Sequence, residues 1–600
     1  MWKFVQSTEY SVLSTQYLVH GAVCSFLGLV LVCAAAAAPP KMNSLFPAGV
    51  QQGQAVVVTA AGDFSAWPVE VWADRGGLKI SAEKDKGKFK IEAAADAVPG
   101  TYWLRAFNAD GASSLRPFIV GTVAESVEVE ANDTPDKPQA TSGPVVINGK
   151  LNKSGDVDGY RVELKRGQTL VASLAANSVL GSPMDAVLQV CELVEKRYSS
   201  PVSSQGSGTP APRGVEAYLL AQNHDACGLD PQIACTAPRD GTYLVRLFAF
   251  PATPDSSVRF AGGDDYIYRL TLTSGPYLDH VLPLAVPFAE SQVELGGWNL
   301  ASLARVGVPP FSATTDRIAP PDEPLAWVWQ PGVAGAFAAV RCEAPTATSA
   351  TKELPIPGVV SGRLAEAGQS DAFRLAAKKG QKLHFRVAAK SLGFPTDAVL
   401  TIHDAAGSVL AEADDAGRDD RDPQLEFTPP ADGQYTIRVK ELAGRGGERM
   451  VYRLNAEPAR PDFSLSLAAD AFVLEKGKRL EIPVNITVRD GLREAIEIHA
   501  VGLPQGLSAA PVKFVPSGDS PARDTGGGRR GRRSGSTSAP AGPSVKLVVQ
   551  RDANVSLPAG VPIRIEGRTS GAEGLVRTAR FSLNLPLAGQ HHAVWVTLKE

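Results

Sequence analysis

Aspartates in two stretches of this chain are the residues best suited to bind an ion. Calcium takes about six to eight oxygen ligands from carboxylates and carbonyls, which clustered aspartates on loops supply. The candidates are Asp156, Asp158, Asp225 and Asp230 in the first half of the chain and Asp414, Asp415 and Asp422 in the second. Aspartate also caps turns by accepting hydrogen bonds from nearby backbone. A calcium site and solvated turns therefore stay open as two interpretations, and no other cofactor is expected.

Three cysteines offer a different chemistry. In an oxidising compartment Cys191 could form a disulfide with Cys227 or with Cys235. No Cys-x-x-Cys pair exists, so the usual spacing of a zinc site is missing.

Common catalytic motifs are missing from the sequence. It contains no Gly-x-Ser-x-Gly, no His-Glu-x-x-His, no phosphate-binding loop and no dinucleotide fingerprint. The 8 histidines follow no recognisable nucleophile–base pattern. We therefore expect a protein that is not an enzyme, although a triad built from distant residues would escape such a search.

Two further features allow either a binding or a structural interpretation. Trp327 and Trp329 stand two residues apart and so on one face of a strand, as in a sugar-stacking surface or in ordinary core packing. Arg529–Arg533 lies in a Gly/Ser/Pro-rich tract and is either an anion-binding cluster or a solvated linker. The formal net charge of -3 over 600 residues gives no reason to expect nucleic acid as a partner.

A duplicated segment carries the aspartates. The run Val146–Leu151 returns as Val359–Leu364, and Lys165–Gln168 returns as Lys378–Gln381 in the same register. Self-similarity of this kind marks a chain built from copies of one module. Gln369 stands in the second copy where Asp156 stands in the first.

The elements that must position these residues are strands. Short runs alternate apolar and polar residues, turn residues separate them (57 Gly and 45 Pro), and no long window shows helical spacing. A chain of 600 residues is too long for one core. The prediction is an all-β chain of tandem β-sandwich domains: an Ig-like domain at 44–121, a first repeat at 125–274, a degenerate Ig-like domain at 275–341, a second repeat at 342–458, and a C-terminal Ig-like domain at 462–600 with a disordered loop at 517–544.

Residues 1–38 have the pattern of a secretory signal peptide. The apolar run Ala22–Val32 is followed by small residues, with cleavage expected near Ala36–Ala38. The run is too short for a comfortable transmembrane helix. We expect a protein that is secreted, periplasmic or on the cell surface and not transmembrane, with lipid anchoring at Cys33 as the alternative.

Several motifs of the repeats resemble a known family. They are Glu130-Ala131-Asn132-Asp133-Thr134, the Gly-Asp-x-Asp-x-Tyr run Gly155–Tyr160, and the Asp-Gly-x-Tyr runs Asp240–Tyr243 and Asp432–Tyr435. Together they resemble the bacterial pre-peptidase C-terminal (PPC) domain in both repeats. Phe46–Gly49 resembles the start of IPT/TIG-type Ig-like domains, and the arrangement resembles planctomycete-type secreted proteins. The second repeat departs from the family pattern, since it lacks the Glu-x-Asn-Asp linker.

The resemblance implies jelly-roll-like sandwiches of the kind found beside secreted proteases or in adhesive surface proteins. We therefore expect a non-catalytic secreted or cell-surface protein for binding, adhesion or spacing, with extracellular polysaccharide or protein as the partner. The alternatives are an accessory chain of a secreted peptidase and a hydrolase with an unrecognised site.

Overall fold

The computed structural model describes most of the chain that follows the predicted signal segment. Described are residues 38–197, 213–254, 256, 259–301, 303, 305–311, 324–417, 420–516, 542–552, 555, 557–571, 574–583, 585 and 590–599. Cys33, nearly all of the predicted signal peptide, most of the predicted loop 517–544 and the Arg529–Arg533 cluster lie outside these residues.

Strands dominate the described residues, which confirms the all-β prediction. The helical elements found there are α1 (Asn177–Leu180) and a 3-10 turn, η1 (Lys390–Leu392). Period-two patterning explains the strands: in β37 (Leu480–Arg489) the buried residues Ile482, Val484 and Ile486 alternate with more exposed ones. Within the described part of the chain, no helix is long and apolar enough to cross a bilayer.

The first module is a sandwich of two sheets around Val58, Phe89, Tyr102 and Phe118. One sheet has the order β1 (Lys41–Phe46), β3 (Ala55–Asp63), β6 (Lys88–Ala93), β5 (Leu78–Ala82). The other has the order β2 (Gly49–Gln51), β9 (Arg116–Gly121), β7 (Gly100–Asn108), β4 (Glu70–Ala73), with β8 (Gly111–Ala112) paired to β7.

Each repeat is also a two-sheet sandwich with its own core. In the first repeat the sheets are β10 (Ala124–Val127), β12 (Val145–Lys150), β19 (Ile267–Thr273), β14 (Thr169–Ala175), β17 (Gln232–Thr236) and β11 (Gln139–Ala140), β13 (Asp158–Leu164), β18 (Gly241–Pro251), β15 (Met184–Arg197), β16 (Arg213–Asn223). In the second they are β26 (Thr346–Thr348), β27 (Gly358–Arg363), β34 (Val451–Pro458), β29 (Leu383–Ala388), β32 (Gln424–Phe427) and β28 (Ser370–Ala377), β33 (Gly433–Glu441), β30 (Ala398–His403), β31 (Val409–Ala413). The strand order is the same apart from β11, whose counterpart in the second repeat is a single parallel bridge between Glu353 and Arg374.

Strand register also recurs between the repeats. Gly149 pairs with Tyr268, and Gly362 pairs with Tyr452 at the matching position. A Cβ on either glycine would lie 2.3 Å from the ring of its tyrosine partner. Glycine is therefore needed at both positions because the tyrosine lies flat against the backbone.

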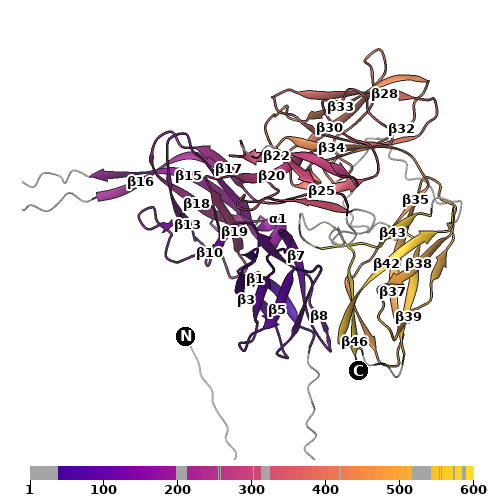
Figure 1. The fold of residues 1–600 in the computed structure, drawn as a ribbon, viewed down its shortest axis with the longest axis horizontal. Helices are drawn as coiled ribbons and strands as arrows, with labels where there is room; N and C mark the ends of the chain where they lie inside the picture. The colour runs from indigo at the N-terminus through magenta and orange to yellow at the C-terminus, as the bar shows by residue number, and fades with distance from the viewer. Residues whose placement is uncertain are drawn as a thin grey trace, which may run out of the picture. The chain divides into compact units, whose positions relative to one another are not determined.

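The middle module (residues 275–341) and the last module (residues 462–600) complete the chain (Figure 1). The middle module has sheets β20 (Tyr277–Leu282), β22 (Ser291–Trp298), β23 (Arg305–Val308) and β21 (Ala285–Pro287), β25 (Phe337–Cys342), β24 (Leu325–Val328). The last module has sheets β35 (Asp462–Ser466), β37, β41 (Ser544–Arg551), β39 (Leu507–Ala509) and β36 (Ala471–Glu475), β46 (Val594–Lys599), β42 (Gly560–Thr569), β38 (Ile496–Val501), β40 (Val512–Phe514).

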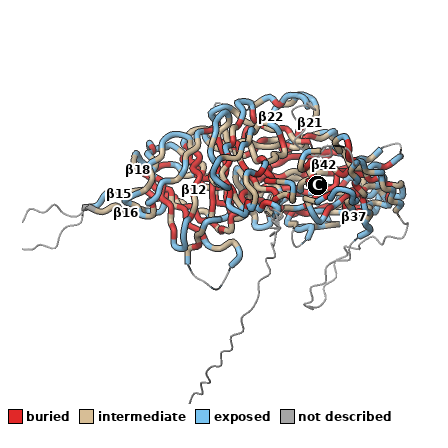
Figure 2. The backbone as a smooth tube through the Cα atoms, turned by 90° about the horizontal axis from the view of Figure 1, so that it is seen from below, coloured by how far each residue is buried: buried red, intermediate tan, exposed pale blue. Residues whose placement is uncertain are grey.

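Smaller strands of the last module lie beside these sheets: β43 (Val576–Thr578) pairs with β42, and β44 (Phe581–Ser582) pairs with β45 (Gln590–His591). Residues 38–600 cluster into a single compact unit. Buried backbone runs through the interior of this unit, and exposed residues gather on its loops and outer strands (Figure 2).

Candidate metal centre

Three carboxylates of the first repeat meet at one place. Oxygen atoms of Glu128, Glu130 and Asp158 lie within 4.8 Å of one another. Glu128 and Glu130 belong to the linker segment (residues 128–133), which continues from β10, and Asp158 begins β13. The backbone N–H of Glu128 donates to the carbonyl of Asn148 over 2.9 Å, which holds the linker segment against β12.

Several oxygens around this group are buried without a hydrogen-bond donor. Within the described residues these are Asp158 Oδ1, Asp156 Oδ1, Asn132 Oδ1 and Asp133 Oδ1. Asp158 is 0% exposed and Asp156 is 1% exposed. A buried acceptor without a partner costs about 1–3 kcal/mol, and more when it is charged. The cluster therefore has more acceptors than the protein satisfies, as expected at a cation site.

Two buried tyrosines hold the carboxylates in position through hydrogen bonds. The Tyr268 hydroxyl donates to Asp158 Oδ2 at 2.5 Å, and the Tyr160 hydroxyl lies 3.0 Å from Glu128 Oε1. The two hydroxyls also share a short hydrogen bond with each other. Both tyrosines are 0% exposed, so these hydrogen bonds are shielded from solvent.

The linker segment and the β12–β13 turn are joined by further side-chain contacts. The Asn132 amide donates to Glu128 Oε1 at 3.0 Å, and the Asn152 amide donates to Glu130 Oε1 at 2.7 Å. The Lys153 ammonium lies 3.7 Å from Asp133 Oδ2 and 3.9 Å from Asp156 Oδ1. Lys153 is 69% exposed along its side chain, so it neutralises the cluster only at its outer edge.

Without a bound cation, the ionised form of these carboxylates is disfavoured. Burial, followed by the nearby charge of Glu128, raises the pKa of Asp158 from 3.8 to about 10. Burial is also the main cause that raises the pKa of Asp156 and of Glu130. A divalent cation would reverse this effect, since it stabilises the ionised carboxylates. All the donors are oxygens, which suits calcium or magnesium better than zinc or copper.

In the second repeat, a neutral amide side chain takes the place of one of these carboxylates. Gln369, at the position of Asp156, donates from Nε2 to Asp371 Oδ1 at 3.1 Å and to the Arg363 carbonyl at 3.0 Å. Asp371, at the position of Asp158, accepts its other hydrogen bond from Tyr452 at 2.6 Å. The amide therefore satisfies the carboxylate that Asp156 leaves unsatisfied in the first repeat.

The preceding segment of the second repeat has also lost its acids. The Ser349 N–H donates to the Ser361 carbonyl, the same hydrogen bond that Glu128 makes to Asn148. By this alignment Ser349 and Thr351 replace Glu128 and Glu130. Of the two copies, the first alone keeps the acidic cluster in the described residues.

Two of the predicted calcium ligands have a different role. Asp230 is buried, and its carboxylate accepts hydrogen bonds from the backbone N–H groups of Ala176, Asn177 and Ser178 at the start of α1, at 3.0, 2.7 and 3.1 Å. Asp422 does the same for η1, accepting from Ala389, Lys390 and Ser391 at 3.0, 2.8 and 3.0 Å. The calcium interpretation is wrong for these two residues because backbone donors already occupy both oxygens.

The remaining predicted ligands lie on the surface. Asp225, Asp414 and Asp415 are exposed. Asp415 pairs with Arg421 at 3.2 Å, and Asp414 accepts from the backbone N–H of Asp415. None of the three belongs to a group of metal-binding side chains within the described ranges. Their geometry is that of solvated turns.

The structure does not contain the predicted disulfide. Cys191, Cys227 and Cys235 are free thiols. Cys191 lies on β15 and Cys235 on β17, which belong to opposite sheets of the sandwich. Burial raises the pKa of Cys227 to about 12, which makes its thiol unreactive at neutral pH.

Trp327 and Trp329 are both half-buried. The guanidinium of Arg75, from the first module, lies 4.8 Å from the centre of the Trp327 ring. This contact favours packing over sugar stacking as the role of Trp327.

Sequence reasoning missed the two glutamates and the two tyrosines of the centre. Glu128, Glu130 and Asn132 stand at every second position, the spacing of side chains on one face of a strand. That spacing was a usable signal, whereas the approach of Tyr268 from β19 depends on the folded sheet.

The comparisons with known proteins place one domain family in the chain. Residues 369–441, from the start of β28 to the end of β33, match the family model of the bacterial pre-peptidase C-terminal domain. A search of curated proteins returns no match.

Solved structures that resemble parts of the chain are distant from it. The pre-peptidase C-terminal domain of collagenase from Bacillus anthracis is 14% identical, with a TM-score of 0.14, covering 19% of this chain and 94% of that one. A tetra-tandem repeat from the extending region of a large adhesion protein is 10% identical, with a TM-score of 0.13, covering 93% and 99%. Fibronectin(III)-like modules of Clostridium thermocellum CbhA are 11% identical, with a TM-score of 0.12, covering 40% and 95%.

These likenesses are too weak to carry an argument about function. The match over 73 residues, 369 to 441, is the finding that names a family. Residues 369–441, within the second repeat, are therefore similar to the bacterial pre-peptidase C-terminal domain.

Proposed function

We propose that the chain is a non-catalytic binding or accessory protein of the cell exterior whose first repeat binds calcium. Glu128, Glu130, Asp156 and Asp158 supply carboxylate ligands, and Asn132 supplies an amide oxygen. The observation that carries the proposal is the fully buried Asp158, whose Oδ1 has no donor while two other carboxylates lie beside it.

Calcium would join two segments of the first repeat that are far apart in the sequence. Glu128 and Glu130 come from the linker segment, which lies between β10 and β11 of the first repeat, and Asp156 and Asp158 come from the end of the β12–β13 turn and the start of β13. A cation bound to both would fix the linker segment on the sandwich. The bound ion would act as a structural brace, with no role in bond chemistry.

The binding or accessory role is supported by the kind of modules present. Stacked β-sandwiches offer loops and sheet faces for contact with a partner. The family named by residues 369–441 carries a pre-peptidase description, which supports an accessory role beside a secreted peptidase as the second candidate. Extracellular polysaccharide or protein remains the partner class that we propose first.

Calorimetric titration of the metal-stripped full chain with calcium chloride tests the site. We expect one calcium per chain, with magnesium weaker because it demands near-ideal octahedral geometry and loses its bound water reluctantly. Asp158→Asn should abolish binding, since the amide keeps the shape and removes the charge.

Asp371→Asn in the second repeat is the matched control and should leave the titration unchanged. Two calcium ions per chain, or equal loss in both variants, would contradict the assignment to the first repeat. No heat and no melting shift at millimolar calcium would end the proposal.

A glycan array probed in calcium and in EGTA tests the partner class. Binding of polysaccharide that calcium strengthens supports the first candidate. Absence of any glycan signal, with stable co-purification of a peptidase encoded beside this chain, would favour the accessory role.

A further inference from the structure

The first and last modules touch each other although most of the chain lies between them. Arg105 on β7 and Asp470, just before β36, are 365 positions apart, and Arg105 Nη2 donates to Asp470 Oδ2 at 2.6 Å. Arg105 is 0% exposed, and its other described hydrogen bond runs to the carbonyl of Ser113. Within the described residues, Asp470 is the carboxylate that pairs with this buried cation.

Aromatic side chains from both modules surround this ion pair. Trp595 on β46, which is 2% exposed, has its ring centre 4.5 Å from that of Phe107 and 5.8 Å from that of Trp72. Trp103 meets His591 at 4.5 Å. Tilted and edge-on contacts at these separations are favourable ring geometries.

The apolar core of the last module continues into the first. Trp103 and Leu115 belong to the same buried cluster as Phe463, Leu474 and Val594 of the last module. At the rim, Lys599 Nζ pairs with Asp110 Oδ1 at 3.1 Å. Strand β8 contacts β36 and β46; β8 and β46 are labelled near each other in Figure 1.

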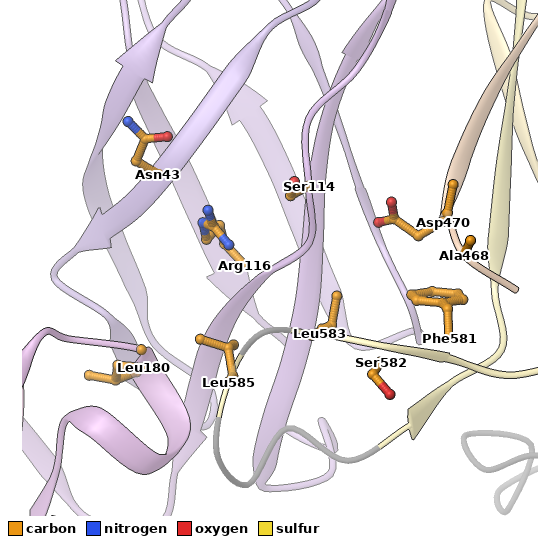
Figure 3. Close-up of a pocket in the computed structure, with 12 residues that line it drawn as sticks. Asn43, Ser114, Arg116, Leu180, Ala468, Asp470, Phe581, Ser582, Leu583 and Leu585 are labelled. Atoms are coloured by element: carbon orange, nitrogen blue, oxygen red, sulfur yellow. The ribbon is translucent and has the colours of Figure 1, made fainter. Parts of the chain in front are cut away.

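A cavity of about 400 Å³ marks one border of the junction. In Figure 3, Ser114 and Arg116 of the first module line one side of it, and Asp470 and Phe581 of the last module line the other. The contact therefore has the anatomy of a protein interface: an aromatic and aliphatic centre, one desolvated charge pair and a polar rim.

We propose that this interface, which we call the clasp (Trp72, Trp103, Arg105, Phe107 and Asp110 with Asp470, His591, Trp595 and Lys599), is the docking surface for the chain's own last module. The clasp joins the two ends of the described chain. The modules between them are then held at both ends and do not move independently. Tethering favours the intramolecular partner because its effective concentration is high.

Chemical cross-linking of the full chain tests the clasp. Asp110→Cys with Lys599→Cys places two thiols at the rim, and a short bismaleimide should join them within one chain. The parental chain without these cysteines is the blank. Asp110→Cys with Lys546→Cys, an exposed residue on β41 that pairs with Glu481, should give no such product.

Asp470→Asn in the double-cysteine chain should lower the cross-linking rate about tenfold or more, since it removes the partner of a desolvated arginine. Glu481→Gln is the matched control: it neutralises an exposed ion pair with Lys546 in the same module and should change nothing. Trp595→Ala should slow the reaction further, and circular dichroism shows whether that variant still folds.

Cross-links that form only between two chains would overturn the proposal in favour of exchange between copies. Absence of any specific product, or a rate that Asp470→Asn leaves unchanged, would overturn it outright.

Discussion

The raised pKa of Asp158 predicts an unusual pH dependence for the metal-free first repeat. In the folded state this carboxyl has a pKa of about 10, against 3.8 as its ordinary value. The folded repeat therefore keeps the proton over a range in which the unfolded chain releases it. The stabilisation of the folded repeat by this proton is complete below about pH 4 and is lost as the pH rises toward 10.

The magnitude follows from the width of that range. Each pH unit between the two pKa values lowers the free energy of unfolding by about 1.4 kcal/mol. Between pH 4 and pH 7 the loss amounts to about 4 kcal/mol, a large share of the stability of a small domain.

Hydrogen–deuterium exchange of the β13 amides in EDTA measures this effect locally. After correction for the intrinsic rate, protection should fall about tenfold per pH unit between pH 5 and pH 8. Asp158→Asn carries no titrating proton and should lack this slope. Calcium should restore protection at high pH, because it binds the ionised carboxylate.

The pH slopes of the wild type and of Asp158→Asn, compared with each other, show whether Asp158 holds the proton. Equal slopes in the two proteins would show that the proton is not held by Asp158. A wild-type slope that persists in saturating calcium would show that the cation does not contact this carboxylate.

Two further predictions concern buried charges elsewhere. Asp230→Ala and Asp422→Ala should each lower the free energy of unfolding of their own repeat by about 3 kcal/mol, because three backbone N–H groups lose their acceptor. Urea denaturation measures this loss. A change below about 1 kcal/mol would contradict the capping role. Arg449→Met should cost about 3 kcal/mol in thermal unfolding, because Asp279, which is 5% exposed, loses its 3.0 Å partner. The exposed pair of Arg374 is the control, and Arg374→Met should cost less than about 1 kcal/mol.

Much of the fold follows from short-range pattern. Alternation of apolar residues predicts the strands, and the duplicated Gly149 and Gly362 predict two modules with one register. The shared register exists because each glycine must admit a tyrosine ring from the strand paired with it. Local pattern carries that information, since both partners lie within one sheet.

The candidate site was only half predictable. Asp156 and Asp158 were identified from their clustering, and the buried acceptors around them explain why they matter. Asp230 and Asp422 gave the same sequence signal, yet each serves a helix start more than 30 positions earlier in the chain. The cysteines likewise looked close along the chain, although strand topology separates Cys191 and Cys235 into opposite sheets.

One glutamine makes the two repeats differ in how their equivalent aspartate is stabilised. The Gln369 amide donates a hydrogen bond to the Asp371 carboxylate, whereas Asp158 Oδ1 in the first repeat has no such donor among the described residues. If the first repeat binds calcium as we propose, removal of calcium would loosen that repeat and leave the second repeat unchanged. On this proposal, the duplication gave one copy whose stability depends on the surrounding solution and one whose stability does not.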